Sequence, residues 1–176
     1  MPREFDKKRW LSESLKRYTR TSNKNSLAPL RLRKDIESID GLSKIVEWCE
    51  AQDVSVKFVS EAGGSWAGES RTVYITTRAT PEFQLILALH ECGHLLVESF
   101  EESDFLERFG DGKNVSFAQK KNIQHRVDCV SEEFEAWHQG WKLVKLLGLH
   151  VDRTTFLRWK NKLLRSYMIW ATRRSL

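Results

Sequence analysis

The spacing of apolar residues changes several times along the chain, and each change predicts a new element. Between positions 35 and 52, apolar side chains recur every three or four residues, which predicts a helix facing a core. From Val54 to Phe58 apolar and polar residues alternate, and 72–76 is rich in β-branched residues, so both segments are typical of strands. The glycine-rich stretch over 63–68 reads as a turn, and the sequence therefore predicts a β-hairpin.

A helix that starts at Pro81 is expected to lie at the centre of the fold. Proline suits the first turn of a helix, and Thr80 before it is a suitable N-cap. The residues from there to about position 100 are apolar nearly all round, which is typical of a helix covered on every side. The acidic stretch over 100–112 has no clear periodicity and is expected to be a surface loop.

Two more helices are predicted near the C-terminus. A long helix is expected over roughly 118–147, with Gly148 as its C-terminal stop. Asp152 or Thr154 can cap a last helix with one apolar stripe. The predicted fold class is α+β, with a short antiparallel sheet packed on the central helix and long C-terminal helices.

Charge is distributed unevenly along the 176 residues. Residues 1–34 contain 11 Lys and Arg against three acids, residues 153–176 contain seven against none, and the middle carries a net charge of −10. We therefore expect a basic N-terminal extension over 1–34, a domain over 35–152, and a basic C-terminal helix over 153–176 packed on that domain. The basic ends either fold back on the acidic centre or bind nucleic acid or another acidic partner.

Export and membrane insertion are not expected. No run of about 18 uncharged apolar residues occurs, and the charged start differs from a secretory signal, so the sequence predicts a cytoplasmic protein without a membrane span. The three cysteines are too few and too scattered for a disulfide framework. Cys92 is expected to be a packing residue.

The central helix contains His90-Glu91-Cys92-Gly93-His94, which is the H-E-x-x-H pattern. Histidines four residues apart lie on one face of a helix, so both imidazoles can bind one ion, for which Zn²⁺ is the expected metal. Glu91 can then reach a metal-bound water as a general base. Two alternatives remain at this stage: histidines satisfied by hydrogen bonds in the core, and a zinc site without catalysis.

A third ligand has to come from another segment, because catalytic zinc usually has three protein ligands. The candidates lie on the predicted long helix, where Glu132, Glu135 and His138 share a face and Glu133 joins Trp137 on another. Glu135 is central on the polar face. We therefore expect Glu135 to be the ligand, with Glu132 and His138 as its rivals.

These segments resemble the ImmA/IrrE-type metallopeptidases, which are small gluzincin-like zincins of bacteria, phages and mobile elements. The resemblance covers roughly 40–140 and rests on the strand Thr72-Val73-Tyr74-Ile75, on the motif helix over 87–96, and on Glu133-Phe134-Glu135-Ala136, which is similar to the family's E-x-E-A element. It implies a zincin-like domain in which His90, His94 and Glu135 hold zinc and Glu91 is the base.

Motif and resemblance together predict a zinc-dependent peptidase that hydrolyses a peptide bond in a protein or peptide substrate, with transcriptional regulators among the candidate substrates. The strand around 73–76 is expected to bind an extended substrate as an added strand. The alternative is a zinc-stabilised, non-catalytic module that engages DNA or a regulatory protein. A DNA-associated protease of the SprT-like type fits less well, because such proteins have a third histidine soon after the first pair and the 14 residues after His94 contain none.

Overall fold

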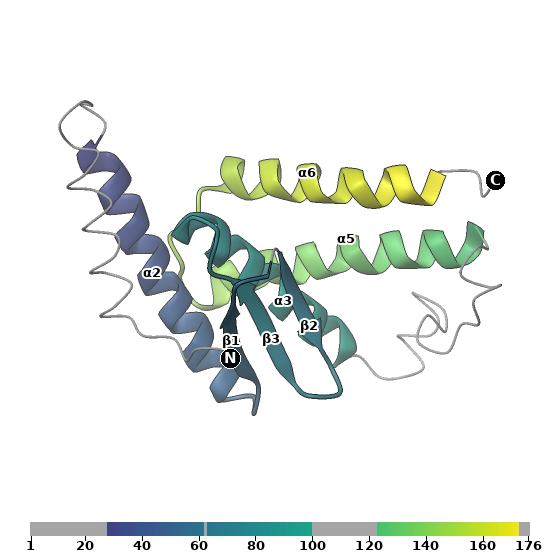
Figure 1. Ribbon diagram of the computed structural model, residues 1–176, viewed down its shortest axis with the longest axis horizontal. Coiled ribbons are helices and arrows are strands. Elements are labelled where there is room, and N and C mark those ends of the chain that lie inside the picture. Colours follow the sequence, from purple (N-terminus) through teal and green to yellow (C-terminus); the bar gives the residue numbers. More distant parts are fainter. Residues whose placement is uncertain (1–27, 62, 100–122, 173–176) are drawn as a thin grey trace.

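The computed structural model describes residues 28–61, 63–99 and 123–172, and these residues form an α+β fold (Figure 1). In chain order the elements are α2 (Ala28–Glu50), β1 (Ser55–Val59), β2 (Gly64–Ala67), β3 (Thr72–Thr76), α3 (Pro81–Glu98), α5 (Ile123–Leu146) and α6 (Arg153–Thr172). The predicted fold class is confirmed at this level. Helix α2 starts seven residues before the expected domain boundary, whereas residues 1–27 and the loop expected over 100–112 lie outside the described residues.

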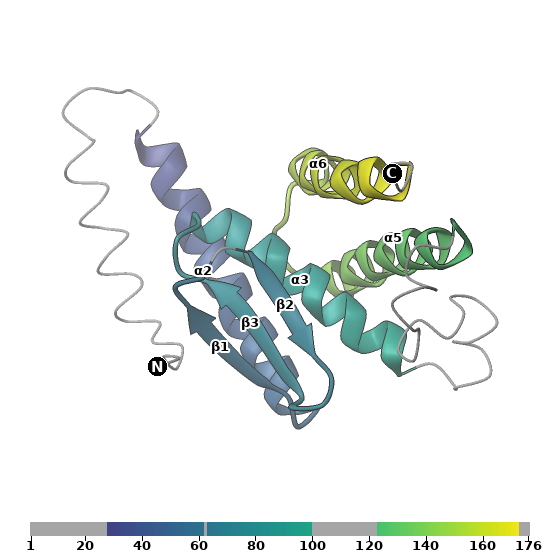
Figure 2. The ribbon, with the colours of Figure 1, turned by 45° about the vertical axis from the view of Figure 1, so that its right-hand side comes forward.

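The sheet differs from the sequence prediction. Strand β3 is central, pairs in parallel with β1 and pairs antiparallel with β2, so the sheet is mixed (Figure 2). The expected hairpin between 54–58 and 72–76, and with it the antiparallel sheet, is wrong. The reason is that the glycine-rich stretch expected to be one turn contains β2, so the chain reverses direction twice between β1 and β3.

Helix α3 lies at the centre, as its apolar sequence predicts. Thr80 caps it, with Oγ1 accepting a hydrogen bond from the N–H of Phe83 at 3.4 Å, and Pro81 begins its first turn. The sheet, α2 and α5 all pack against it (Figures 1 and 2). Thirteen of its 18 residues are buried, so the polar residues among them require polar partners.

Two cysteines meet where α2 packs on α3. The Sγ atoms of Cys49 and Cys92 lie 3.4 Å apart, and neither residue has exposed area. Both are free thiols. This agrees with the packing role expected of Cys92.

Helices α3 and α5 cross at a close backbone contact. A Cβ added to Gly93 of α3 would overlap the carbonyl oxygen of Ala136 on α5. In the same way, a Cβ on Gly140 of α5 would lie 2.5 Å from the carbonyl oxygen of Leu89 on α3. Since glycine alone fits both positions, this pair of residues sets how near the two helices come.

Helix α6 runs back along α5 (Figure 1). Asp152 caps it by accepting a hydrogen bond from the N–H of Thr155 at 2.7 Å, which confirms the first of the two predicted caps. Near the start of α6, Phe156 packs against Trp137 with ring centroids 5.3 Å apart. Near its end, Arg126 of α5 donates a hydrogen bond to the carbonyl of Ala171 at 3.3 Å. None of the helices in the described ranges is long and apolar enough to cross a membrane.

Candidate metal centre

The motif residues lie on α3 close to its crossing with α5. His90 and Glu91 are buried, and the side chain of His94, one turn later, is 14% exposed. Opposite them, α5 presents Glu133, which is also buried. The close crossing of the two helices is what brings a carboxylate of α5 within reach of histidines on α3.

The two imidazoles converge on the carboxylate of Glu133. His90 Nε2 lies 3.2 Å from Glu133 Oε2, and His94 Nε2 lies 3.5 Å from Glu133 Oε1. One ligand atom from each residue fits within a mutual distance of 4.8 Å. A tetrahedral zinc ion with bonds of about 2.0–2.2 Å needs ligand atoms about 3.5 Å apart, so the three side chains have the spacing for one ion.

Packing fixes the ring of His90. Its imidazole stacks on the indole of Trp137, with centroids 4.3 Å apart and planes 18° from parallel. The ring of His94 stands nearly perpendicular to it, with centroids 4.7 Å apart. The two rings therefore approach Glu133 from different directions, as ligands around one ion must.

The electrostatics of the three residues favour a cation between them. Burial lowers the pKa of His94, but the carboxylates of Glu132 and Glu133 and the charge of Glu91 raise it to about 10. Burial raises the pKa of Glu133, but His90 and His94 outweigh this and lower it to about 2. In the absence of a metal, a proton on His94 therefore supplies the positive charge that the buried carboxylates require.

Glu91 lies on the side of the centre that faces the sheet. A Cβ on Gly64 of β2 would lie 2.9 Å from Glu91 Oε1, and the main-chain N–H of Trp66, on the same strand, donates to this carboxylate. Burial raises the pKa of Glu91, although the charges of His90 and His94 and the hydrogen bond from Trp66 act against it. Strand β2 thus holds a carboxyl group of increased proton affinity beside the candidate metal ligands.

A divalent metal fits this site by two criteria. The donor set of two imidazoles and one carboxylate is found in catalytic zinc sites. In addition, Glu133 Oε2 is buried and, although His90 Nε2 lies 3.2 Å away, it accepts no hydrogen bond of standard geometry among the described residues. A buried carboxylate oxygen without such a hydrogen bond carries a desolvation cost that a bound cation removes.

The structure brings together only part of the predicted ligand set. His90 and His94 meet as expected, but the carboxylate beside them is Glu133 and not Glu135. Glu135 Oε1 instead accepts a hydrogen bond from Gln139 Nε2 at 2.6 Å. His138 is exposed, and Glu132 lies on the outer side of His94, with Oε1 3.6 Å from Nδ1.

The sequence contains a pattern that places Glu133 on the buried face of α5. Glu133, Ala136, Trp137 and Gly140 follow the spacing of one helix face, and all four are buried. Small residues such as Ala136 and Gly140 often mark a close contact between helices. Because this buried face packs against α3, Glu133 and not Glu135 belongs to the group that could hold an ion with His90 and His94.

Tyr167 of α6 is a further neighbour of the site that is not among the residues predicted from the sequence. Burial, then the charge of Glu133 and the interaction with its carboxylate, raise the pKa of Tyr167. Its phenol is therefore a neutral neighbour of the third candidate ligand. A contact between residues 34 positions apart depends on how α6 lies along α5, which no local pattern specifies.

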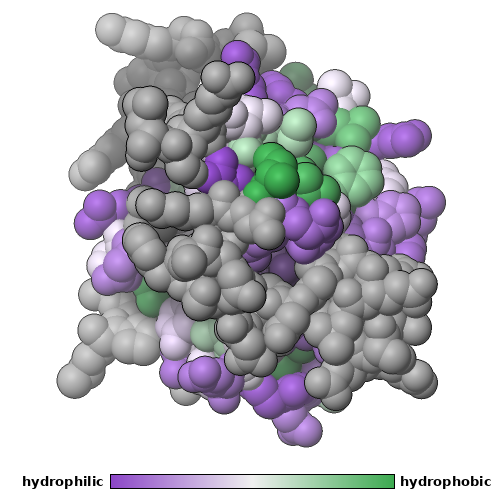
Figure 3. All heavy atoms as spheres, turned by 90° about the vertical axis from the view of Figure 1, so that its right-hand side faces the viewer, coloured by the Kyte–Doolittle hydropathy of each residue, from purple (hydrophilic) through white to green (hydrophobic). Residues whose placement is uncertain are grey.

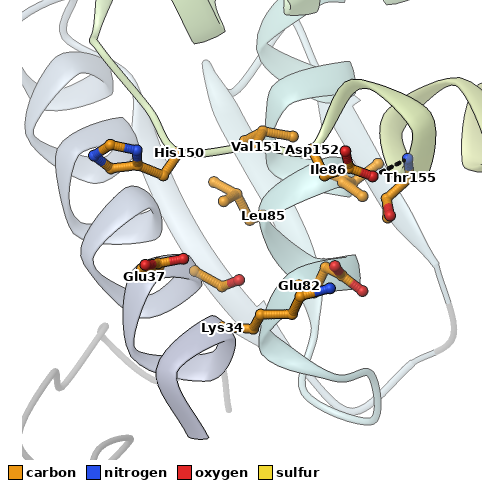
Figure 4. Close-up of a pocket in the computed structure, with 10 residues that line it drawn as sticks. Lys34, Glu37, Glu82, Leu85, Ile86, His150, Val151, Asp152 and Thr155 are labelled. Atoms are coloured by element: carbon orange, nitrogen blue, oxygen red, sulfur yellow. Dashed lines mark hydrogen bonds between the residues drawn. The ribbon is translucent and has the colours of Figure 1, made fainter. Parts of the chain in front are cut away.

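A small pocket lies apart from this centre, between α2, the start of α3 and the segment joining α5 to α6 (Figure 4). The residues that line it include one basic side chain, Lys34, and two acidic ones, Glu37 and Glu82. Asp152, also in the lining, is engaged in capping α6. These groups do not form a convergent donor set like the one around Glu133.

No family model, curated protein or solved structure matches this chain.

Proposed function

We propose that the chain is a metal-dependent peptidase in which His90, His94 and Glu133 hold Zn²⁺ and Glu91 transfers protons. The observation that carries this proposal is the convergence of two imidazoles and a carboxylate within 4.8 Å, with a separate buried carboxyl group beside them. A site that only stabilised the fold would need a fourth ligand and no neighbouring base. The resemblance of the motif helix and of the E-x-E-A element to ImmA/IrrE-type peptidases supports the same activity.

The role of each side chain follows from its place. Zinc, when bound, polarises a carbonyl group and lowers the pKa of water to about 7. Glu91 does not belong to the group that can hold the metal, so its carboxyl group is free to take a proton from water and return it to the leaving amine. Burial raises the pKa of Glu91 above its ordinary value, which makes its carboxylate a stronger base toward water.

The strand that the sequence suggested for substrate binding is not available, and a different strand takes this role in our proposal. Strand β3, which includes the expected residues 73–76, is paired on both sides and cannot accept another strand. Strand β2 pairs only with β3 among the described residues, and its main chain contacts Glu91. We therefore propose that an extended peptide pairs with the free edge of β2, which directs its backbone past the proton-transferring carboxyl group.

The first experiment separates metal binding from hydrolysis. Purified protein is analysed for bound metal and incubated with a mixture of unstructured peptides, whose cleavage is followed by mass spectrometry. The parent should contain about one zinc per chain, and Glu91→Gln should keep the metal but lose cleavage. Cleavage by Glu91→Gln at the parent rate would contradict the role given to Glu91.

The second experiment identifies the third ligand. Glu133→Ala should lose the metal as completely as His90→Ala and His94→Ala, whereas Glu135→Ala should retain it. The two glutamates lie on the same helix, two residues apart, so the pair is a matched comparison. Loss of metal in Glu135→Ala alone would restore the ligand set implied by the family resemblance.

One observation favours a second candidate function, a zinc-stabilised module that binds DNA or a regulatory protein. Helix α6 contains five Lys and Arg and no acidic residue. Figure 3 looks onto the end of the molecule where α5 begins and α6 ends, and it shows hydrophobic side chains among hydrophilic ones. The exposed hydrophobic residues of these two helix ends include Ile123, Val127, Met168, Ile169 and Trp170. Such a module would lose stability but no hydrolytic activity when a chelator removes the metal.

A further inference from the structure

The two ring nitrogens of His94 face two different carboxylates. Nε2 lies 3.5 Å from Glu133 Oε1, whereas Nδ1 lies 3.6 Å from Glu132 Oε1. Adjacent residues on a helix point about 100° apart, so Glu132 and Glu133 can reach the ring from two sides. One nitrogen is therefore directed toward the candidate metal position, and the other toward a carboxylate outside it.

The chemistry of imidazole gives the outer contact a function. A neutral imidazole carries its proton on one nitrogen and a lone pair on the other, and a metal binds the lone pair. Binding through Nε2 therefore requires the proton to be on Nδ1. A carboxylate at Nδ1 accepts that proton in a hydrogen bond, which fixes the tautomer and the orientation of the ring.

The ring of His90 is held by different contacts from the ring of His94. The Nδ1 atom of His90 is buried and has no hydrogen-bond partner among the described residues, while its ring is stacked on Trp137. The side chain of His94 is more exposed than that of His90, at 14% against 9%, and its ring lacks an aromatic partner of this kind in the described part of the chain. His94 therefore depends on its polar neighbours for orientation.

We infer that Glu132 is a positioning residue, which accepts the Nδ1 proton of His94 and so directs Nε2 toward Glu133 and the metal. The exposure of Glu132 suits this role. Its side chain is 31% exposed, against 12% for Glu133, so water can hydrate the carboxylate oxygen that does not face His94. The inference rests on the proposed metal site but requires no catalytic activity.

The test compares three full-length variants by their affinity for Zn²⁺ in competition with a chromogenic chelator. Glu132→Met removes the acceptor at similar length, Glu132→Gln removes the charge but keeps an acceptor oxygen, and Glu135→Met is the matched control on the same helix. We expect Glu132→Met to bind zinc about 10- to 100-fold more weakly than the parent, as is usual when the partner of a metal-binding histidine is lost. Glu132→Gln should recover most of this loss, and Glu135→Met should stay within about twofold of the parent.

Two outcomes would overturn the inference. The first is an affinity of Glu132→Met equal to that of the parent or of Glu135→Met. The second is a Glu132→Gln variant as weak as Glu132→Met, because the charge alone would then be responsible. Thermal unfolding of the metal-free proteins controls for misfolding, and the His94 tautomer of the zinc-loaded parent keeps the inference falsifiable if Glu132→Met does not fold.

A second readout reports the tautomer directly. In nitrogen-15 spectra of the zinc-loaded parent, the His94 ring should carry its proton on Nδ1, and this proton should exchange faster in Glu132→Met. A ring protonated on Nε2 would contradict the inference. Absence of zinc binding in the parent would reject the proposed metal site, whereas the expected affinity pattern without peptide cleavage would reject only the peptidase activity.

Discussion

The candidate metal centre lies between the crossing of α3 and α5, which we call the helix side, and strand β2, which we call the strand side. The two sides are held in place by different kinds of contact. On the helix side, α3 and α5 meet through main-chain contacts at Gly93 and Gly140, which leave no room for a side chain. On the strand side, Glu91 is held by β2, a four-residue edge strand. The positions of the candidate ligands therefore depend on backbone packing, whereas the position of Glu91, the proposed proton-transferring group, depends on a short edge strand. Each of the following changes acts mainly on one side.

The largest effect is expected at the helix crossing. Gly93→Ala places a methyl group against the carbonyl of Ala136, so the helices must separate, and we expect a loss of about 3 kcal/mol in the free energy of unfolding. Gly41→Ala is the control, because its Cβ would meet only the flexible end of the Leu85 side chain, at 2.9 Å. Urea unfolding of the metal-free proteins measures both changes. Equal losses for the two variants would show that the crossing is not tightly constrained.

The second largest effect is expected in the pH dependence of zinc affinity, which depends on the charge of His94. Metal binding requires neutral His94, whose pKa in the metal-free protein is raised to about 10, so binding should release about one proton at pH 7. The apparent affinity for zinc should then rise about tenfold per pH unit between pH 7 and 9. Calorimetry in buffers of different ionisation enthalpy counts the proton. An affinity independent of pH over this range would contradict a protonated His94.

The same shifts set the pH dependence of stability without metal. The pKa of His94 is raised from 6.5 to about 10, so its stabilising contribution is complete below pH 6.5 and is lost as the pH rises through about 10. The pKa of Glu133 is lowered from 4.5 to about 2, so its contribution is complete above pH 4.5 and is lost as the pH falls through about 2. The part of the stability that these two groups supply should be greatest between pH 4.5 and 6.5, which chemical unfolding across pH can verify.

The smallest effect is expected on the strand side. In Gly64→Ala the added methyl group lies 2.9 Å from Glu91 Oε1, so the carboxylate must move while the zinc ligands stay in place. Peptide cleavage should fall about tenfold, with zinc affinity within about twofold of the parent. Ser65→Ala on the exposed side of the same strand should leave both unchanged. A parallel fall in zinc affinity would mean that the two sides are not independent.

The sequence predicted those features that depend on residues close together in the chain, such as helix caps and the spacing of side chains along one helix. The motif helix has a threonine cap, a proline in its first turn and apolar residues all round, and each signal acts within a few residues. The paired histidines follow from helix geometry alone. For the same reason the sequence predicts Asp152 or Thr154 as the cap of α6, and the structure has Asp152 there.

Pairings between distant segments could not be predicted in this way. Strand β2 has only four residues, too few for an alternating pattern, so the mixed sheet was taken for a hairpin. The choice between Glu133 and Glu135 depends on which face of α5 meets α3. That is decided by the fit of Gly93 and Gly140 against the opposite backbones, which is a property of the helix pair and not of either sequence alone.

The shortness of β2 has a consequence for how firmly a peptide is held. Only every second residue of an edge strand directs its N–H and C=O outward, and the N–H of Trp66 is already donated to Glu91, so the strand offers about three hydrogen bonds to a peptide. At roughly 0.5–1.5 kcal/mol each, these bonds at best match the association cost of at least about 4 kcal/mol. A chain captured by this strand alone would leave within a short residence time. Cleaved fragments would then escape readily, and discrimination among targets would have to come from surfaces outside the scissile region.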